Sequence, residues 1–256
     1  LGQDENGEDI LVKGFFLEDD ELTFTNEKPY VIYGYAAVPG NKTLTVEAGA
    51  RVHFHDGSGI IVAQNASMKS LGLPSLDREA MENEVIFEGD RLEPAFADVP
   101  GQWLTIWLTS GSVDNEFNYT TIKNSTVGIL MEDCPVTLKN VQIYNSTNVG
   151  LLSRTGSIDA ENMVINNSGQ SSLAIQLGGS YEFRHCTFAN YWTNGFRSFP
   201  AVSLDNSLET STEILVFDLI KADFKNCIIY GNERRELLLF QVTGGAFNFN
   251  FENCLL

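Results

Sequence analysis

His53, His55 and Asp56 are the residues whose types and spacing come closest to a metal site. His53 and His55 are two positions apart, so on an extended strand both imidazoles project from the same face, and Asp56 follows directly. Imidazole and carboxylate ligands suit a divalent transition metal, and imidazole also suits acid–base chemistry near neutral pH. The alternative is that the three side chains only decorate an exposed strand.

A second candidate site is the aromatic segment at residues 191–200. Its rings could form a stacking platform for sugars, with an amide and a guanidinium group supplying hydrogen bonds. The alternative is that the rings pack over the edge of the core or over the insertion at residues 205–218. The candidate substrate-binding residues are Tyr191, Trp192, Asn194, Phe196 and Arg197, together with Arg154 and Asp133, which we expect on the same face.

Acidic residues are the third chemical feature. A polysaccharide lyase needs several carboxylates around Ca²⁺ and a basic residue, and a glycosidase needs two carboxylates at a set separation. We expect the acids of the regular repeats not to stack three deep on one face, so no catalytic residue is assigned. No cofactor is expected; Ca²⁺ is the open alternative, although no motif supports a Ca²⁺ site. A solvated, charge-balanced face is predicted for Asp159, Glu182 and Asp223, with Lys139, Arg184 and Lys225 nearby.

The elements that carry these residues follow an internal repeat. A pattern of two short alternating stretches separated by a bend recurs, and its bend residue steps by 22, 23, 41 and 27 positions. A unit near 22 residues is typical of one coil of a solenoid, and the longer steps indicate inserted loops. The marker residues are Asn140, Asn162, His185, Asn226 and Asn253.

Alternation within each copy indicates the type of solenoid. Val136 and Leu138 share one face and Val141 and Ile143 share one face, but the parity slips between the two pairs. The chain must therefore bend at Asn140 to keep both pairs inward, and Asn tolerates the left-handed conformation that such a bend needs. Stacked Asn side chains can also form a hydrogen-bonded ladder. The predicted fold is all-β, a single-stranded right-handed parallel β-helix with coils of about 22 residues.

Two rows of inward residues follow from this register. Cysteines occupy three positions of the first row, where a thiol packs as a small hydrophobic group. A disulfide or a soft-metal site is the open alternative. The first row is Val141, Met163, Cys186, Cys227 and Cys254, and the second is Ile143, Ile165, Phe188, Ile229 and Leu256.

Composition limits the partners. The chain has 256 residues, 43% of them hydrophobic, and a formal net charge of -18. A field of that sign repels phosphate backbones and anionic lipid headgroups, so nucleic acid is not expected as a partner. No run is long enough and apolar enough to be a transmembrane segment.

The expected organisation is an acidic flexible tether at residues 1–13 and one β-helix domain at residues 14–256. Within that domain we expect an N-terminal cap and first coils at 14–110 and regular coils at 111–256, continuing past Leu256. Helix-forming composition occurs only at residues 75–84, with Ser75 as the N-cap. Because the chain does not begin with Met, we expect that a targeting segment has been removed.

One stretch carries a family resemblance. It is similar to the phrase LTIEPGTVIKF of right-handed β-helix repeat proteins from the Bacteroidetes surface, most of which are uncharacterised. The resemblance spans residues 12–256 and implies an extracellular or cell-surface protein, held at the outer membrane only by a lipid anchor upstream of Leu1. The stretch is Leu44-Thr45-Val46-Glu47-Ala48-Gly49-Ala50-Arg51-Val52-His53-Phe54.

These observations favour an exported surface module without an evident catalytic site. Adhesion, binding of a polysaccharide or a host or cell-surface glycan, and a structural role in the envelope are the expected functions. The alternative is a polysaccharide lyase or glycoside hydrolase whose carboxylates come from the loop insertions. Fold alone does not decide between them.

Overall fold

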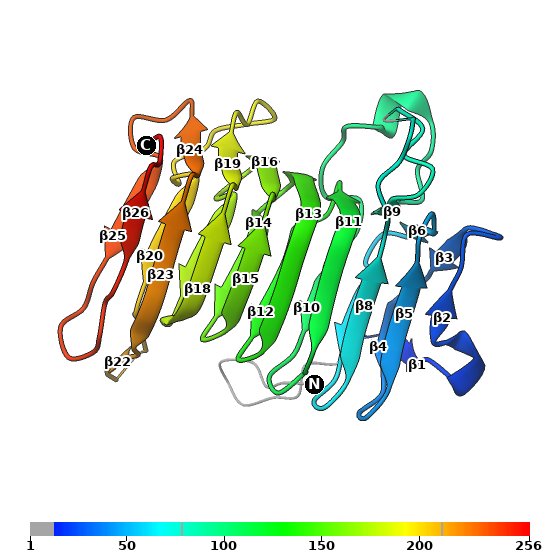
Figure 1. Cartoon of the computed structure of the whole chain (residues 1–256), viewed down its shortest axis with the longest axis horizontal. Helices are drawn as coiled ribbons and strands as arrows, with labels where there is room; N and C mark the ends of the chain where they lie inside the picture. The colour runs from blue at the N-terminus through cyan, green and yellow to red at the C-terminus, as the bar shows by residue number, and fades with distance from the viewer. Residues whose placement is uncertain (1–12, 78, 211) are drawn as a thin grey trace.

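An all-β solenoid forms the molecule, with β1–β3 at one end of its long axis and β25 and β26 at the other (Figure 1). The computed structural model describes residues 13–256 except residues 78 and 211, so the expected tether at residues 1–13 lies almost wholly outside the described residues. Consecutive coils pair through parallel strands, which confirms the predicted all-β parallel β-helix.

The first sheet runs the length of the solenoid. Its nine strands follow one another in chain order, and every pairing between neighbours is parallel. They are β1 (Gly14–Phe16), β4 (Tyr35–Val38), β7 (Gly59–Val62), β10 (Ile106–Leu108), β12 (Val127–Glu132), β14 (Val149–Arg154), β17 (Leu173–Gln176), β20 (Val202–Asp205) and β25 (Leu237–Phe240).

The second sheet follows each strand of the first after a turn, and a third row of strands follows the second after a bend. The second sheet contains β2 (Thr23–Phe24), β5 (Thr43–Glu47), β8 (Ser67–Leu71), β11 (Asn115–Lys123), β13 (Pro135–Ser146), β15 (Ser157–Glu161), β18 (Gly179–Arg184), β23 (Leu219–Lys225) and β26 (Asn250–Glu252). The third row contains β3 (Tyr30–Ile32), β6 (Arg51–Phe54), β9 (Val85–Gly89), the second halves of β11 and β13, β16 (Val164–Ser168), β19 (Thr187–Asn190) and β24 (Ile228–Gly231).

Three smaller features lie outside these rows. An antiparallel hairpin joins β21 (Ser207–Glu209) to β22 (Ile214–Val216). Two single-turn 3₁₀ helices span Asp19–Glu21 and Pro94–Phe96. The described part of the chain has no helix that is both long and apolar enough to cross a lipid bilayer.

Strand register gives the length of a coil. Val127 pairs with Val149 and Leu151 pairs with Leu173, which is a step of 22 residues in each case. The step from Val202 to Leu237 is longer because the hairpin is inserted between β20 and β23. The strands on both sides of the hairpin still pair in parallel, with one register shift between Gly179 and Ser180 where β18 meets β23.

Left-handed residues make the bends between the second and third rows. All five predicted bend residues have a positive φ, between 53° and 55°, at Asn140, Asn162, His185, Asn226 and Asn253. Asn162 Nδ2 donates to Asn140 Oδ1 over 2.8 Å, and Asn140 Nδ2 donates to Asn118 Oδ1 over 3.2 Å. The predicted asparagine ladder is confirmed at these residues.

A second ladder follows the third row. Asn124, Asn145 and Asn167 also have positive φ values. Asn145 Nδ2 donates to Asn124 Oδ1, and Asn167 Nδ2 donates to Asn145 Oδ1. The second ladder satisfies the side-chain amides of Asn124 and Asn145, which are buried at a corner of the solenoid.

The core fills the interior of the solenoid in rows that run along its axis. Every residue of the two predicted inward rows is buried except those of the last coil, where Cys254 is half-buried and Leu256 is 60% exposed. Phe183, Phe224 and Phe251 stack on one another with ring centroids 4.8 Å apart at each step. Burying such rings supplies most of the driving force that holds neighbouring coils together.

The expectation of a helix at residues 75–84 is wrong. The described residues there form turns, because the Asp77 carboxylate accepts the amides of Glu79 and Ala80 and holds only one tight turn. Ser75 is not an N-cap, and its hydroxyl accepts the amide of Asn83 across the loop instead. Local hydrogen bonds of this kind compete with helix formation.

Candidate functional site

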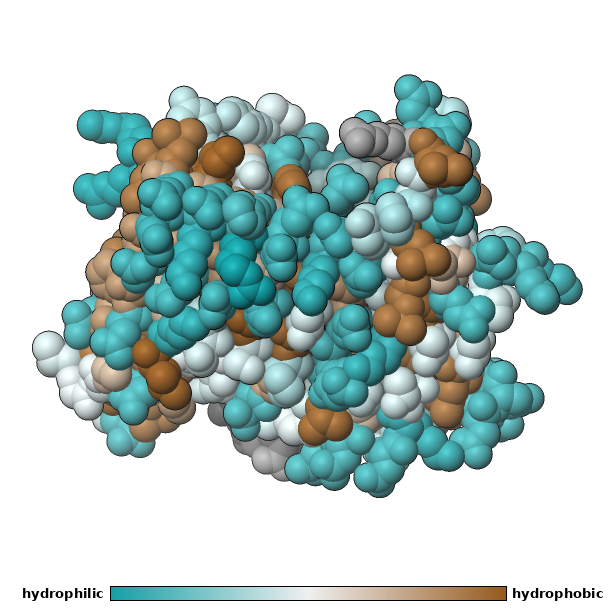
Figure 2. All heavy atoms as spheres, in the orientation of Figure 1, coloured by the Kyte–Doolittle hydropathy of each residue, from teal (hydrophilic) through white to brown (hydrophobic). Residues whose placement is uncertain are grey.

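The candidate site lies on the outer face of the second sheet. In β15 the inward residues Ile158 and Ala160 are buried, while Ser157, Asp159 and Glu161 point outward. The same alternation holds in the other long strands of the sheet, because one face is covered by the core and the other meets solvent. Figure 2 shows that hydrophilic side chains cover most of this face over β13, β15, β18 and β23.

Register turns these outward residues into rows along the solenoid axis. Asp159 pairs with Glu182 and Glu182 pairs with Asp223, so three acidic residues occupy one row on successive strands. The expectation that the acids would not stack three deep is therefore wrong. The insertion between β18 and β23 hides the register in the sequence, because it separates Glu182 from Asp223 by almost two coil lengths.

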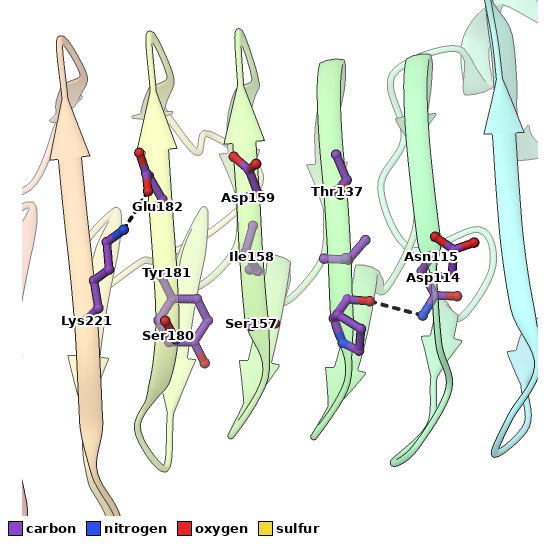
Figure 3. A pocket seen from close by; sticks show the side chains of 12 residues that line it. Asp114, Asn115, Thr137, Ser157, Ile158, Asp159, Ser180, Tyr181, Glu182 and Lys221 are labelled. Atoms are coloured by element: carbon purple, nitrogen blue, oxygen red, sulfur yellow. Dashed lines mark hydrogen bonds and ion pairs between the residues drawn. The ribbon is translucent and has the colours of Figure 1, made fainter.

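A parallel row lies beside the acids, with two serines at its centre. Pro135 pairs with Ser157, Ser157 with Ser180, and Ser180 with Lys221. Ser157 and Ser180 have short side chains, and the surface around them is an open groove of about 530 Å³. Figure 3 shows its lining side chains on five neighbouring strands: Asp114, Asn115, Pro135, Val136, Thr137, Ser157, Ile158, Asp159, Ser180, Tyr181, Glu182 and Lys221.

Cations neutralise the acidic row. Glu182 is the centre: Lys221 Nζ lies 2.5 Å from its Oε2, Arg184 lies 3.0 Å from its Oε1, and Lys225 lies 3.7 Å from its Oε1. Arg184 also reaches Asp159 Oδ1 at 2.6 Å. The predicted charge-balanced face is confirmed in this part of the sheet, although Lys221 takes the role that was expected of Lys139.

These contacts determine the protonation state of Glu182. Hydrogen bonds from Lys221 and then Arg184 lower the pKa of Glu182 from 4.5 to about 2. The same contact with Glu182 raises the pKa of Lys221. At neutral pH the pair stays fully ionised, so Glu182 can accept hydrogen bonds but does not supply the proton that a general acid must donate. The arrangement is suited to binding polar groups.

The groove residues Thr137, Ser157, Ser180 and Lys221 were not predicted as site residues. Three of them could have been predicted from the sequence, because each comes two positions before an acidic residue that points outward. These pairs are Ser157 and Asp159, Ser180 and Glu182, and Lys221 and Asp223. That spacing places them on the same outer face.

The predicted metal site is not assembled. Nδ1 of His53 lies 3.6 Å from Glu88 Oε1 without a hydrogen-bond partner, and Nδ1 of His55 lies 2.8 Å from Asp90 Oδ2. The histidines thus face carboxylates of the next coil, while Asp56 is exposed in the following turn. Among the described residues, no group of three His, Cys, Asp or Glu side chains is placed to hold a metal ion.

Some residues of the predicted sugar platform are buried and the others are exposed. Trp192 is 8% exposed and Arg197 is 3% exposed, so neither presents its side chain to a ligand, and the platform is wrong for these two residues. Arg197 instead forms a two-point ion pair with Glu236. The remaining predicted residues Tyr191, Asn194 and Phe196 are exposed.

Arg154 and Asp133 do not join that loop. Arg154 is the last residue of β14, whereas residues 191–201 lead into the first residue of β20. Because these strands are parallel members of the first sheet, Arg154 and the loop lie at opposite ends of the strands. Asp133 occupies the turn after β12 with a φ of 41° and accepts a hydrogen bond from Ser110.

A smaller groove contains Arg154. It has a volume of about 340 Å³ and lies where the first sheet meets the β21–β22 hairpin. Arg154 is held there by Glu132 and Gln176, each at 3.2 Å. Burial raises the pKa of Asp205, and Glu209 lines the same groove.

Comparison with known proteins identifies the architecture. A family model described as the right handed beta helix region matches residues 106–256. No curated protein matches the chain. Among solved structures, the A-module of the mannuronan C-5 epimerase of Azotobacter vinelandii is 13% identical, with 88% of this chain and 87% of that chain covered and a TM-score of 0.36.

A second solved structure is the catalytic domain of a GH87 α-1,3-glucanase in complex with tetrasaccharides. It is 15% identical, and the alignment covers 98% of this chain but 55% of that chain, with a TM-score of 0.31. Likenesses this distant say nothing about activity. The family match covers more than half of the chain, and the protein therefore belongs to the right-handed β-helix family.

Proposed function

We propose that this protein binds neutral polysaccharide chains in the groove on the second sheet. The observation that carries the proposal is the groove itself, which crosses β11, β13, β15, β18 and β23. Neighbouring parallel strands are about 4.8 Å apart, so polar groups repeat along roughly 19 Å. Hydroxyl, carboxylate and ammonium groups together offer both donors and acceptors to the hydroxyls of an extended glycan.

Net charge selects among glycans. The chain carries a formal charge of -18, and three acidic residues but one lysine line the groove. A polyanion such as a chain of uronates is repelled by this field, most strongly at low ionic strength. Neutral glycans incur no such repulsion, and the ionised Glu182–Lys221 pair can still hydrogen-bond to them.

The proposed setting is the cell surface. The stretch Leu44–Phe54 resembles exported surface proteins of Bacteroidetes, and this resemblance supports a protein held at the outer membrane through a lipid anchor upstream of Leu1. A glycan-binding module in that place serves adhesion, glycan capture or envelope structure. Protease shaving of intact cells that express the full gene product, followed by detection of this domain in the released fraction, tests the location. Retention inside the cells after shaving contradicts it.

A polysaccharide screen tests the binding function. Immobilised neutral glucans, mannans and xylans are compared with polygalacturonate for retention of the protein at low and moderate salt. We expect retention by at least one neutral polymer and none by polygalacturonate. Binding only to the acidic polymer, or to none of the polymers, would refute the proposal.

One observation favours hydrolysis as a second function. Asp205, the last residue of β20, has a raised pKa, which suits a general acid, and it shares the smaller groove with Arg154 and Glu209. In this alternative, Asp205 protonates the glycosidic oxygen, and the carboxylate of Glu209 acts as the general base that activates water or as the nucleophile. The same screen, read for new reducing ends, tests it. Turnover that Asp205→Asn abolishes while binding persists would establish it, and absence of new reducing ends would exclude it for those polymers.

A further inference from the structure

Three cysteines lie one above another inside the last coils. Ile228 N donates to Cys186 O and Leu255 N donates to Cys227 O, both over 2.9 Å. Thr187 pairs with Ile228 and Ile228 pairs with Leu255. The preceding residues Cys186, Cys227 and Cys254 are therefore at the same position of three successive coils, and all three are free thiols.

Their spacing meets the first requirement for a disulfide. Residues at equal positions of adjacent parallel strands are about 4.8 Å apart. Disulfides join residues whose Cα atoms are about 4.4 to 6.8 Å apart. The side chains also point the same way, because each thiol donates to a carbonyl of the preceding coil: Cys227 to Phe183 O at 3.5 Å, and Cys254 to Phe224 O at 3.3 Å.

Exposure and hydrogen bonding distinguish the members of the row. Cys186 and Cys227 are each 1% exposed, whereas Cys254 is half-buried and is the most exposed thiol of the row. The neighbouring Cys186 side chain lowers the pKa of Cys227, which favours its thiolate. Burial raises the pKa of Cys254, so its reaction with an oxidant is expected to be slow.

We propose that Cys227 and Cys254 are a disulfide-forming pair that reversibly cross-links the coil containing β26 to the coil containing β23. The oxidant is a small-molecule disulfide such as oxidised glutathione. The Cys254 thiolate attacks one of its sulfurs, which forms a mixed disulfide and releases one glutathione thiol. The Cys227 thiolate then attacks the Cys254 sulfur, the protein disulfide forms, and a second glutathione thiol leaves. Two protein thiols are oxidised and one disulfide is reduced to two thiols.

Cys134 provides a matched control within the same chain. It is also buried and free, but Pro135 pairs with Ser157, so the residue opposite Cys134 on the next coil is Gly156 and not a cysteine. A thiol that is buried without a cysteine neighbour should not form a disulfide under conditions that oxidise the pair.

The experiment incubates the folded chain with oxidised glutathione, then denatures it, alkylates the remaining thiols and measures the mass of the protein and its peptides. We expect two of the four thiols to escape alkylation, an intact mass lower by about 2 Da before alkylation, and one cross-linked peptide pair containing Cys227 and Cys254. Four alkylated thiols, a stable glutathione adduct on Cys254, or a pair that includes Cys134 would each overturn the proposal.

Variants and a denatured arm make the result specific. Cys134→Ser should leave the cross-link unchanged, and Cys254→Ser should leave all remaining thiols free, because no other thiol of the row is accessible. The same oxidation in denaturant should scramble the pairing, so selective pairing of Cys227 with Cys254 must depend on the fold. Formation of that pair at equal yield in the denatured chain would show that the register does not direct it.

Discussion

Replacing Arg197 with Ala should destabilise the region around the loop at residues 191–200 far more than a surface substitution does. The guanidinium is almost completely buried and binds both carboxylate oxygens of Glu236, at 3.0 and 2.7 Å. It also donates to Phe199 O at 2.6 Å, Asn190 O at 3.0 Å and Asn232 Oδ1 at 2.7 Å. Removal leaves the mostly buried carboxylate of Glu236 without a counter-ion.

A broken buried ion pair of this kind costs about 3–5 kcal/mol. Removing the partly exposed guanidinium of Arg184, which pairs with Asp159 and Glu182, should cost at most about 1 kcal/mol because solvent screens those contacts. The double variant Arg197→Met with Glu236→Met should recover much of the loss, because no unpaired charge stays buried. Arg184→Ala is thus the matched surface control.

Urea unfolding followed by tryptophan fluorescence measures these differences, since Trp192 lies in the affected loop and is buried. Hydrogen exchange then shows whether the loss is local to residues 190–200 and 231–237 or spreads along the solenoid. A loss below about 1 kcal/mol for Arg197→Ala, or a double variant less stable than the single one, would refute the ion-pair account.

Three further predictions concern the corners, the charged face and the core. Asn162→Ala should cost about 1–2 kcal/mol in urea unfolding, because Ala is strained at a φ of 53° and the bond to Asn140 is lost, whereas Asn162→Gly should cost less; equal losses would contradict the left-handed role. The folded-state pKa of Glu182 is depressed, so its stabilisation is complete above pH 4.5 and is lost as the pH falls from 4.5 to about 2. The stability difference between the wild type and Glu182→Gln should therefore shrink over that range in pH-dependent denaturation, and a constant difference would contradict it. Tyr181→Phe should cost about 1–3 kcal/mol, because the buried hydroxyl of Ser153, 2.9 Å from the phenol oxygen, loses its partner; a neutral effect on the thermal midpoint would show that the contact is dispensable.

The corners of the fold could be predicted because their physical requirement acts on single residues. A bend between two inward pairs needs one residue in the left-handed region, and Asn satisfies it at Asn140, Asn162, Asn226 and Asn253. Tyr119 takes the equivalent position of an earlier coil with a φ of 42°. It could not be predicted, since bulky residues rarely adopt that conformation.

The site was harder to predict because it depends on register between coils. An insertion between β18 and β23 hides the pairing of Ser180 with Lys221. The alternation along each strand does predict that both side chains point outward. Burial of Arg197 was missed for a related reason: its counter-ion Glu236 is 39 residues further along and belongs to another coil. A lone Arg among aromatic residues resembles a ligand-binding group until its partner is known.

Binding of a neutral oligosaccharide to the groove tests the central claim most directly. Ser157→Trp places a large ring in the middle of the groove, and Ser203→Trp places the same ring on the outer face of the first sheet as a control. Isothermal titration with oligosaccharides cut from the retained neutral polymer should show binding to the wild type and to Ser203→Trp, and at least about tenfold weaker binding to Ser157→Trp, which corresponds to about 1.4 kcal/mol. Equal affinity for all three proteins would contradict the claim that this groove holds the glycan.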